Sequence, residues 1–129
     1  MATWKRFEDI EAWQMAREFC KDVWRIINYD GLSKDFKLRD QINASSGSVM
    51  DNIAEGFERD GNKEFIYFLS ISKGSIGESR SQLYRIADRE YITEEEFQDL
   101  KSKAEKISGK IKNLMTYLGK SDLKGNKFK

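Results

Sequence analysis

The sequence predicts an all-α protein, an antiparallel up-down-up-down four-helix bundle, and three observations support this fold class. Apolar residues recur at helical spacing in four separate stretches. Short polar segments separate these stretches, as between antiparallel neighbours in a bundle. The 129 residues include no Pro and nine Gly, so the frequent turns of a many-stranded protein are missing. We expect one domain, residues 1–129, with a short arm (1–7), helices near 8–29, 35–59, 62–90 and 94–119, and a flexible basic tail (120–129).

The first predicted helix carries a wide apolar stripe. Its members are Ala12, Trp13, Ala16, Phe19, Cys20, Val23, Trp24 and Ile27. Gly31 follows the last turn, and we expect it to adopt the left-handed conformation that ends many helices. Cys20 is the single cysteine, so it forms no internal disulfide, and its apolar neighbours favour a buried, inert thiol.

The second predicted helix has a weak centre, Ser45-Ser46-Gly47-Ser48, because these residues form helices poorly. Two interpretations are open. A loop could divide the segment, or one helix could use its small residues to let a neighbour approach closely. The apolar positions keep helical phase across the centre, which favours one helix; they are Leu38, Ile42, Val49 and Ile53. Ser33 or Asp35 is expected to cap its start.

The third predicted helix follows a polar turn, Asp60-Gly61-Asn62, and we expect Asn62 to cap it. Its inward positions mix large apolar residues with small ones: Phe65, Phe68, Leu69, Ser72, Ser75, Ile76, Ser79, Leu83 and Ile86. Gly74-Ser75-Ile76-Gly77 has the spacing of an RNA-binding GxxG clamp. Because it lies inside a predicted helix, close helix packing is the favoured interpretation.

The fourth predicted helix begins with the strongest local signal in the chain. Thr93 is followed three residues later by Glu96, which forms a capping box, and the acidic run there suits the positive end of the helix dipole. Apolar residues then repeat at Phe97, Leu100, Ala104, Ile107, Ile111, Leu114 and Leu118. We expect Gly119 to end the helix.

Composition restricts the function. The chain has 23 basic and 22 acidic residues and no His, which removes the usual catalytic base and metal ligand. A di-metal centre in a bundle normally uses Glu-x-x-His, so the carboxylates Glu55, Glu58, Glu64 and Glu78 are interpreted as structural. We therefore expect no catalytic residue, metal or cofactor, and a protein that is not an enzyme. Without a signal peptide or long apolar run, we expect a cytoplasmic protein with no membrane contact.

Several motifs together point to a family. Asn52-Ile53-Ala54-Glu55-Gly56-Phe57 is followed by further short matches: Glu64-Phe65, Phe68-Leu69, Gly74-Ser75, Glu78 and Tyr91-Ile92, with Phe7-Glu8-Asp9 and Trp13 before them. Over about residues 7–119 this set resembles the bacterial four-helix-bundle proteins encoded in intervening sequences of 23S ribosomal RNA genes. Here Met50 stands where the family usually has Pro.

The resemblance implies a homo-oligomeric ring, typically a pentamer. A related protein, the accessory protein of diversity-generating retroelements, is a similar bundle that binds nucleic acid and a reverse transcriptase. That relative is strongly basic, whereas this chain has a formal net charge of +1. The resemblance also implies structural roles for the motif residues Asn52, Glu55, Gly56, Glu64, Phe65, Gly74, Ser75 and Glu78.

Two surfaces are candidates for binding. Lys103, Lys106, Lys110 and Lys120 share one stripe without an obvious acid beside each, so we hypothesise that they contact the phosphates of RNA or DNA. Aromatic residues that do not all fit on the core stripes predict a protein–protein surface: Trp4, Phe7, Tyr67, Tyr84 and Tyr91. The leading hypothesis is a non-enzymatic homo-oligomeric scaffold that contacts nucleic acid. The alternative is a protein–protein adaptor with no nucleic-acid role.

Overall fold

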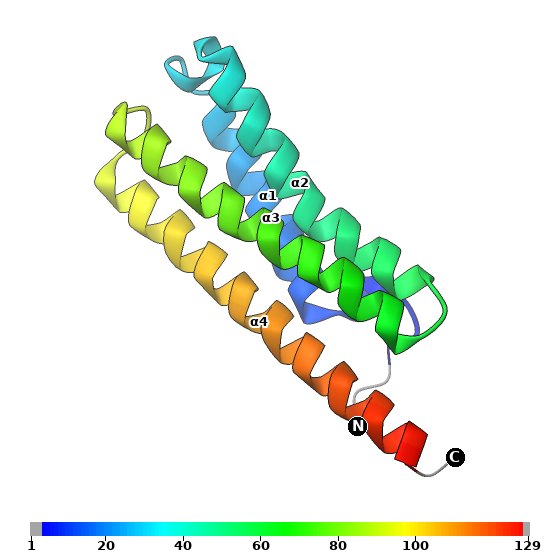
Figure 1. The fold of residues 1–129 in the computed structure, drawn as a ribbon. Coiled ribbons are helices and arrows are strands. Elements are labelled where there is room, and N and C mark those ends of the chain that lie inside the picture. Colours follow the sequence, from blue (N-terminus) through cyan, green and yellow to red (C-terminus); the bar gives the residue numbers. More distant parts are fainter. Residues whose placement is uncertain (1–3, 128–129) are drawn as a thin grey trace.

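The structure is a bundle of four long helices, as predicted. The computed structural model describes the backbone of residues 4–127 and the side chains of residues 4–121. The elements are the 3-10 turns η1 (Phe7–Asp9) and η2 (Leu32–Lys34) and the helices α1 (Glu11–Ile27), α2 (Phe36–Glu58), α3 (Asn62–Asp88) and α4 (Glu94–Lys127), with no strand in the described residues. Each helix packs on the next, and α4 also packs on α1, which closes the bundle (Figure 1).

The C-terminal end of α4 corrects one prediction. The helix does not end at Gly119 but continues to Lys127, and it projects beyond the other three helices (Figure 1). Gly119 has no positive φ. A glycine inside a helix costs only about 1 kcal/mol relative to alanine, which a long continuous helix tolerates. The predicted flexible tail therefore begins as helix, and residues 128–129 lie outside the described part of the chain.

The turn between α1 and α2 differs from its prediction in two ways. Gly31 is not left-handed, since its φ is −70°. Its lack of a side chain makes room for an aromatic ring, because a Cβ there would lie 2.8 Å from Cδ1 of Tyr91. Asp35 holds the N-cap position of α2 without capping it. Its Oδ2 instead accepts hydrogen bonds from Arg89 (2.6 Å) and the Tyr91 hydroxyl (3.0 Å), which tie the start of α2 to the α3–α4 turn.

The starts of α3 and α4 show where local rules hold and where they fail. The capping box of α4 is confirmed, with Thr93 Oγ1 accepting from the Glu96 amide (3.1 Å) and Glu96 Oε1 accepting from the Thr93 amide (2.9 Å). At α3 the N-cap is Gly61, with φ of +108°, and Asn62 is the first helical residue. The Asn62 side chain donates to the Leu118 carbonyl (3.4 Å), so it joins α3 to α4 instead of capping.

Acid should weaken the hydrogen bonds and ion pairs that the Asp35 and Glu96 carboxylates make. The hydrogen bond from Arg89 lowers the pKa of Asp35, and the Thr93 amide lowers the pKa of Glu96. A carboxyl with a lowered pKa in the folded state adds stability above its unfolded pKa and loses it as pH falls through the folded value. We predict that urea midpoints measured from about pH 7 to about pH 2 fall below about pH 4 in the wild type and fall less in Asp35→Asn.

The control for this prediction is Asp88→Asn, because Asp88 is exposed and has no ion pair with another described residue. We expect it to keep the wild-type pH profile. Equal profiles for Asp35→Asn and the wild type would show that the Asp35–Arg89 contact does not contribute to stability.

The core fills the centre of the bundle with most of the predicted apolar positions, including Phe19, Leu69 and Ile111. Trp24, which was placed on the apolar stripe of the first helix, is on the surface and 63% exposed. Phe36 is also on the surface and is 64% exposed. Phe36 is the first residue of α2, and the Arg39 guanidinium lies over its ring at 5.0 Å. No helix in the described part of the chain carries an apolar stretch long enough to cross a bilayer.

The favoured interpretation of α2 is confirmed, because α2 is one unbroken helix. A polar seam, mostly of small residues, joins it to α3. The seam consists of Ser45, Ser48, Ser72, Ser75, Ser79 and Gln82. Ser45 Oγ donates to Gln82 Oε1 (2.6 Å) and lies 2.7 Å from Ser79 Oγ. The Ser48 and Ser75 hydroxyls are 2.8 Å apart, and Ser72 donates to the Val49 carbonyl (2.7 Å). Every buried side-chain N or O among the described residues has a partner, so the seam is a satisfied polar interface.

The GxxG segment packs through its serine and not through its glycines. Ser75 is buried in the seam, whereas a Cβ added to Gly74 or to Gly77 would meet no atom within 4 Å. The predicted close packing is therefore right for Ser75 and wrong for Gly74 and Gly77. Cys20 is only partly buried; its thiol donates to the Ser46 carbonyl (3.2 Å), and burial raises the thiol pKa.

Candidate binding surfaces and the α1–α4 hollow

The lysines proposed to contact phosphates differ in their surroundings. Lys103 Nζ pairs with Asp22 (2.9 Å) on α1 and Asp99 (3.2 Å) on α4, and the hydrogen bond to Asp22 raises its pKa. Lys110 Nζ pairs with Glu11 (2.5 Å). The premise that these lysines lack matching acids is therefore wrong for two of them. Asp99 lies one turn before Lys103 on the same helix, whereas Asp22 and Glu11 come from α1, and sequence spacing does not show which acids a neighbouring helix presents.

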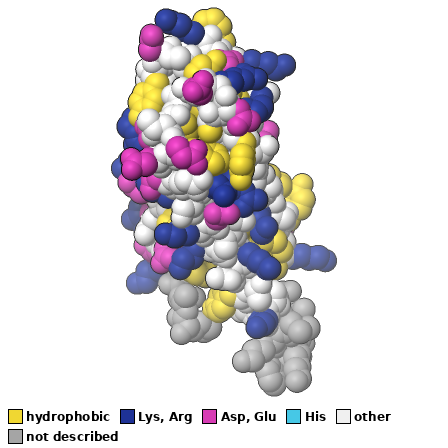
Figure 2. Space-filling view, turned by 90° about the vertical axis from the view of Figure 1, so that its left-hand side faces the viewer, with side chains coloured by type: hydrophobic (Ala, Val, Ile, Leu, Met, Phe, Trp, Pro, Cys, Tyr) yellow, Lys and Arg dark blue, Asp and Glu magenta, His cyan; other side chains and the backbone are white. Residues whose placement is uncertain are grey.

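The remaining candidates, Lys106 and Lys120, are exposed, and no ion pair joins either to another described side chain. Both belong to the stretch from Lys106 to the C-terminus. In the sequence this stretch contains seven lysines and one aspartate. On the face drawn in Figure 2, Lys and Arg side chains gather toward the lower end, where α4 finishes. The C-terminal half of α4 therefore carries the excess positive charge of the helix.

The family-motif residues have different surroundings, and Gly56, Phe65 and Ser75 are the ones that contact the other helix where α2 packs on α3. Asn52 donates to the carbonyl and hydroxyl of Ser48 (2.8 and 2.9 Å), next to the seam. A Cβ on Gly56 would lie 2.7 Å from Phe68 Cβ and 3.0 Å from Cδ1 of Phe65, so the lack of a side chain at Gly56 lets α3 come close at this point. Glu78 Oε2 accepts from Gln82 at 3.5 Å.

The motif carboxylates do not converge. Glu55 pairs with Arg59 one turn later (3.0 Å), and both Glu58 and Glu64 are exposed. Among the described residues there is no group of three or more side chains placed to hold a metal ion. Glu55, Glu58 and Glu64 therefore lie separately on the surfaces of their helices.

The aromatic residues predicted for a surface divide into two groups. Trp4, Phe7 and Tyr91 are partly buried and pack against the core, so less of each is open to a partner. Tyr67 is 61% exposed and Tyr84 is 45% exposed. Tyr84 nevertheless has intramolecular partners, since its ring stands edge-on to Phe97 with centroids 4.9 Å apart.

The outer face of α3, which we define as Tyr67, Ile71 and Gly74, is an apolar stripe on the side of the helix away from core residues such as Leu69 and Ile76. Ile71 is 36% exposed, and all three residues fall on one stripe at i, i+4 and i+7. Gly74 adds no side chain above the helix backbone. The sequence pattern placed Tyr67 off the core stripes, but it did not indicate that Ile71 lies beside Tyr67 on this face.

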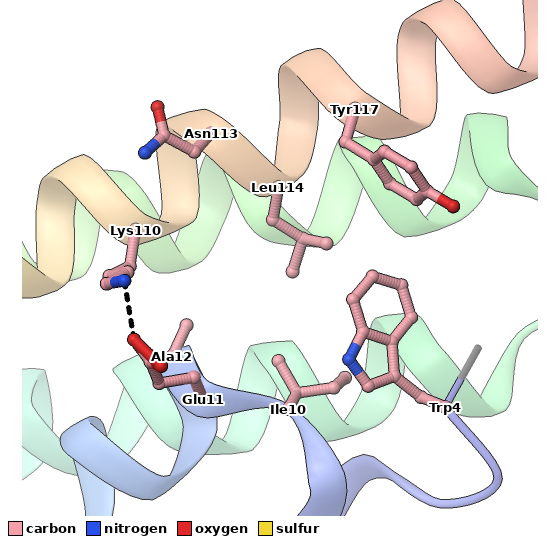
Figure 3. A pocket seen from close by; sticks show the side chains of 8 residues that line it. All are labelled: Trp4, Ile10, Glu11, Ala12, Lys110, Asn113, Leu114 and Tyr117. Carbon is pink, nitrogen blue, oxygen red and sulfur yellow. Dashed lines mark ion pairs between the residues drawn. The ribbon is translucent and has the colours of Figure 1, made fainter. Parts of the chain in front are cut away.

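A hollow of about 240 Å³ lies between α1 and α4 (Figure 3). Ile10, Ala12 and Leu114 form its apolar floor. At one end the Trp4 and Tyr117 rings meet edge to face, with centroids 5.9 Å apart. The Lys110–Glu11 ion pair stands at the other end, and Asn113 lies on the rim. The sequence did not indicate this site, because Trp4 precedes the first helix and meets Tyr117 only once the chain has folded.

The structured arm explains how Trp4 is placed. The Asp9 carboxylate accepts the amides of Lys5 and Arg6 (both 3.3 Å), which holds the chain just before α1. Phe7 packs edge-on against Trp13, with centroids 5.1 Å apart. Residues 4–9 therefore form a strap across the end of the bundle.

These features define a four-helix-bundle protein with a polar α2–α3 seam. The chain belongs to the family of 23S rRNA-intervening sequence proteins, whose sequence model matches residues 8–113. It is also similar to a crystal structure from Bacteroides thetaiotaomicron, a protein of unknown function from the S23 ribosomal protein family. That similarity has a TM-score of 0.69 at 25% identity and covers 81% of this chain and 97% of the other. The comparison with curated proteins gives no match.

Proposed function

We propose that this chain is a non-enzymatic binding or scaffold protein that forms a homo-oligomer through the outer face of α3. The observation that carries the proposal is the exposure of Tyr67 and Ile71 beside Gly74. Burying apolar surface yields about 25 cal/mol per Å², and a glycine lets a second backbone come close. The family resemblance favours five copies.

Light scattering tests this proposal. We expect the purified protein at micromolar concentration to have a mass several times 15.1 kDa, and the double variant Tyr67→Glu with Ile71→Glu to move toward 15.1 kDa because charge opposes burial. Ser102→Glu, an exposed change on α4, is the matched control and should keep the wild-type mass. A wild-type mass of 15.1 kDa would refute the oligomer, and an unchanged double variant would place the contact elsewhere.

A second function, contact with RNA or DNA, is favoured by the lysine-rich C-terminal half of α4. Lys106 and Lys120 are exposed and outside any ion pair between described side chains. One subunit offers few phosphate contacts, but copies held in one assembly act together at high effective concentration. Each neutralised phosphate releases counterions, so binding should weaken steeply with salt.

Fluorescence polarisation with single- and double-stranded RNA and DNA at two salt concentrations tests this function. Lys106→Glu with Lys120→Glu should weaken binding severalfold at low salt. Lys103 and Lys110 are left unchanged because they hold ion pairs with α1. Lys37→Glu, an exposed change on the first turn of α2, is the control. If the wild type does not bind at low salt, or the double variant binds equally well, the protein–protein adaptor is the better proposal.

A further inference from the structure

The hollow between α1 and α4 is amphipathic, and its two ends differ in character. Its floor is made of nearly fully buried apolar side chains, Ile10, Ala12 and Leu114. The Trp4 and Tyr117 rings close one end, whereas a lysine, a glutamate and a carboxamide surround the other (Figure 3). Such a mostly apolar cavity with a few convergent polar groups is the usual form of a small-molecule site.

We propose that this hollow binds a small carboxylate with an apolar body, such as an aryl-alkyl acid. The apolar body lies on Ile10 and Leu114 against the Trp4 ring. The carboxylate lies at the opposite end, where Lys110 and the Asn113 amide supply donors. The proposal goes beyond the proposed function, because neither the outer face of α3 nor Lys106 and Lys120 take part.

The electrostatics of the polar end favour an anion over a cation. Ile10, Glu11 and Ala12 line the hollow at the start of α1, whose N-cap has no side-chain hydrogen bond. The positive end of that helix dipole therefore acts together with Lys110. Glu11 already pairs with Lys110, but both side chains are about half exposed. An exposed ion pair contributes at most about 1 kcal/mol, so an incoming carboxylate can displace Glu11 into water.

The size of the hollow limits the ligand. Pockets for drug-sized molecules enclose about 300–1,000 Å³, and this one encloses about 240 Å³. One aromatic ring with a short acid chain is the size that fits. A ligand this small binds weakly, with a Kd on the order of 1 mM.

The test is a saturation-transfer-difference NMR titration of the full chain with 3-phenylpropionate, its neutral amide and 3-phenylpropylamine. We expect the acid to bind most tightly. Lys110→Gln should weaken the acid about fivefold and leave the amide unchanged. Lys112→Gln, an exposed lysine outside the hollow, is the matched control and should change neither. Trp4→Ala should weaken acid and amide alike, because it removes the aromatic wall without touching the charge.

The alternative results are distinct. No saturable binding of the acid up to about 20 mM would overturn the site. Equal affinity for acid and amide, tighter binding of the amine, or equal effects of Lys110→Gln and Lys112→Gln would each overturn the assignment of the carboxylate to Lys110. Circular dichroism of each variant confirms that the bundle is intact, and Lys110→Gln, at a half-exposed position, keeps the test valid if Trp4→Ala loosens the arm.

Discussion

Phe19→Ala is expected to lower the free energy of unfolding by about 3–5 kcal/mol, the largest loss we expect from any single change. Phe19 lies in the middle of α1 and is 1% exposed, so its removal takes a full aromatic side chain out of the core. The loss combines transfer free energy with the cavity that rigid neighbouring helices leave behind. Chemical denaturation monitored by circular dichroism measures it directly.

Trp24→Ala is the matched control for Phe19→Ala, because it removes a larger aromatic from the same helix. Trp24 is 63% exposed, so we expect a change within about 0.5 kcal/mol. Comparable losses for the two variants would mean that Trp24 is covered in solution, by another copy or another part of the chain. A small loss for Phe19→Ala would contradict the described core.

Phe19 and Trp24 also show what apolar periodicity can and cannot predict. Trp24 is five residues beyond Phe19, which places it about 140° around the helix. A stripe of eight residues is wider than the face that two neighbouring helices can cover, so its edge stays in water. Periodicity therefore predicted the four helices and most core positions, but not the boundary of the buried face.

Helix ends show the same division between local and distant causes. The Thr93–Glu96 box was predictable because both partners lie within one turn. Asp35 and Asn62 look like caps in sequence, yet each bonds to a segment distant in the chain. Such tertiary bonds override local capping preference when the chain folds back on itself, and a single sequence does not display them.

The candidate surfaces were predictable only in part. The lysines of α4 were found from spacing, but their ion pairs with Asp22 and Glu11 depend on the rotation of α1 against α4. The hollow depends on the strap that brings Trp4 across to Tyr117. Both features bring together residues that are more than 80 positions apart in the sequence. Apolar periodicity describes one helix at a time, so it cannot predict such contacts.

The small residues of α2 provide a second stability prediction with a built-in contrast. Gly56 is buried, and a Cβ there would lie 2.7 Å from Phe68 Cβ, an atom held directly by the α3 backbone. No side-chain rotation relieves this contact, so the two helices must move apart. We expect Gly56→Ala to lower the free energy of unfolding by about 1–3 kcal/mol, because overpacking outweighs the gain in helix propensity.

Gly47→Ala, in the same helix, should act in the opposite direction. A Cβ at Gly47 meets nothing within 4 Å, and the residue has no positive φ. Only the propensity gain remains, so the variant should be more stable by about 0.5–1 kcal/mol. Urea denaturation of both variants at equal protein concentration measures the difference in sign. If Gly56→Ala were as stable as Gly47→Ala, the close approach of α2 and α3 at Gly56 would be wrong, and the Ser48–Ser75 contact would have to hold the helices together at a wider spacing.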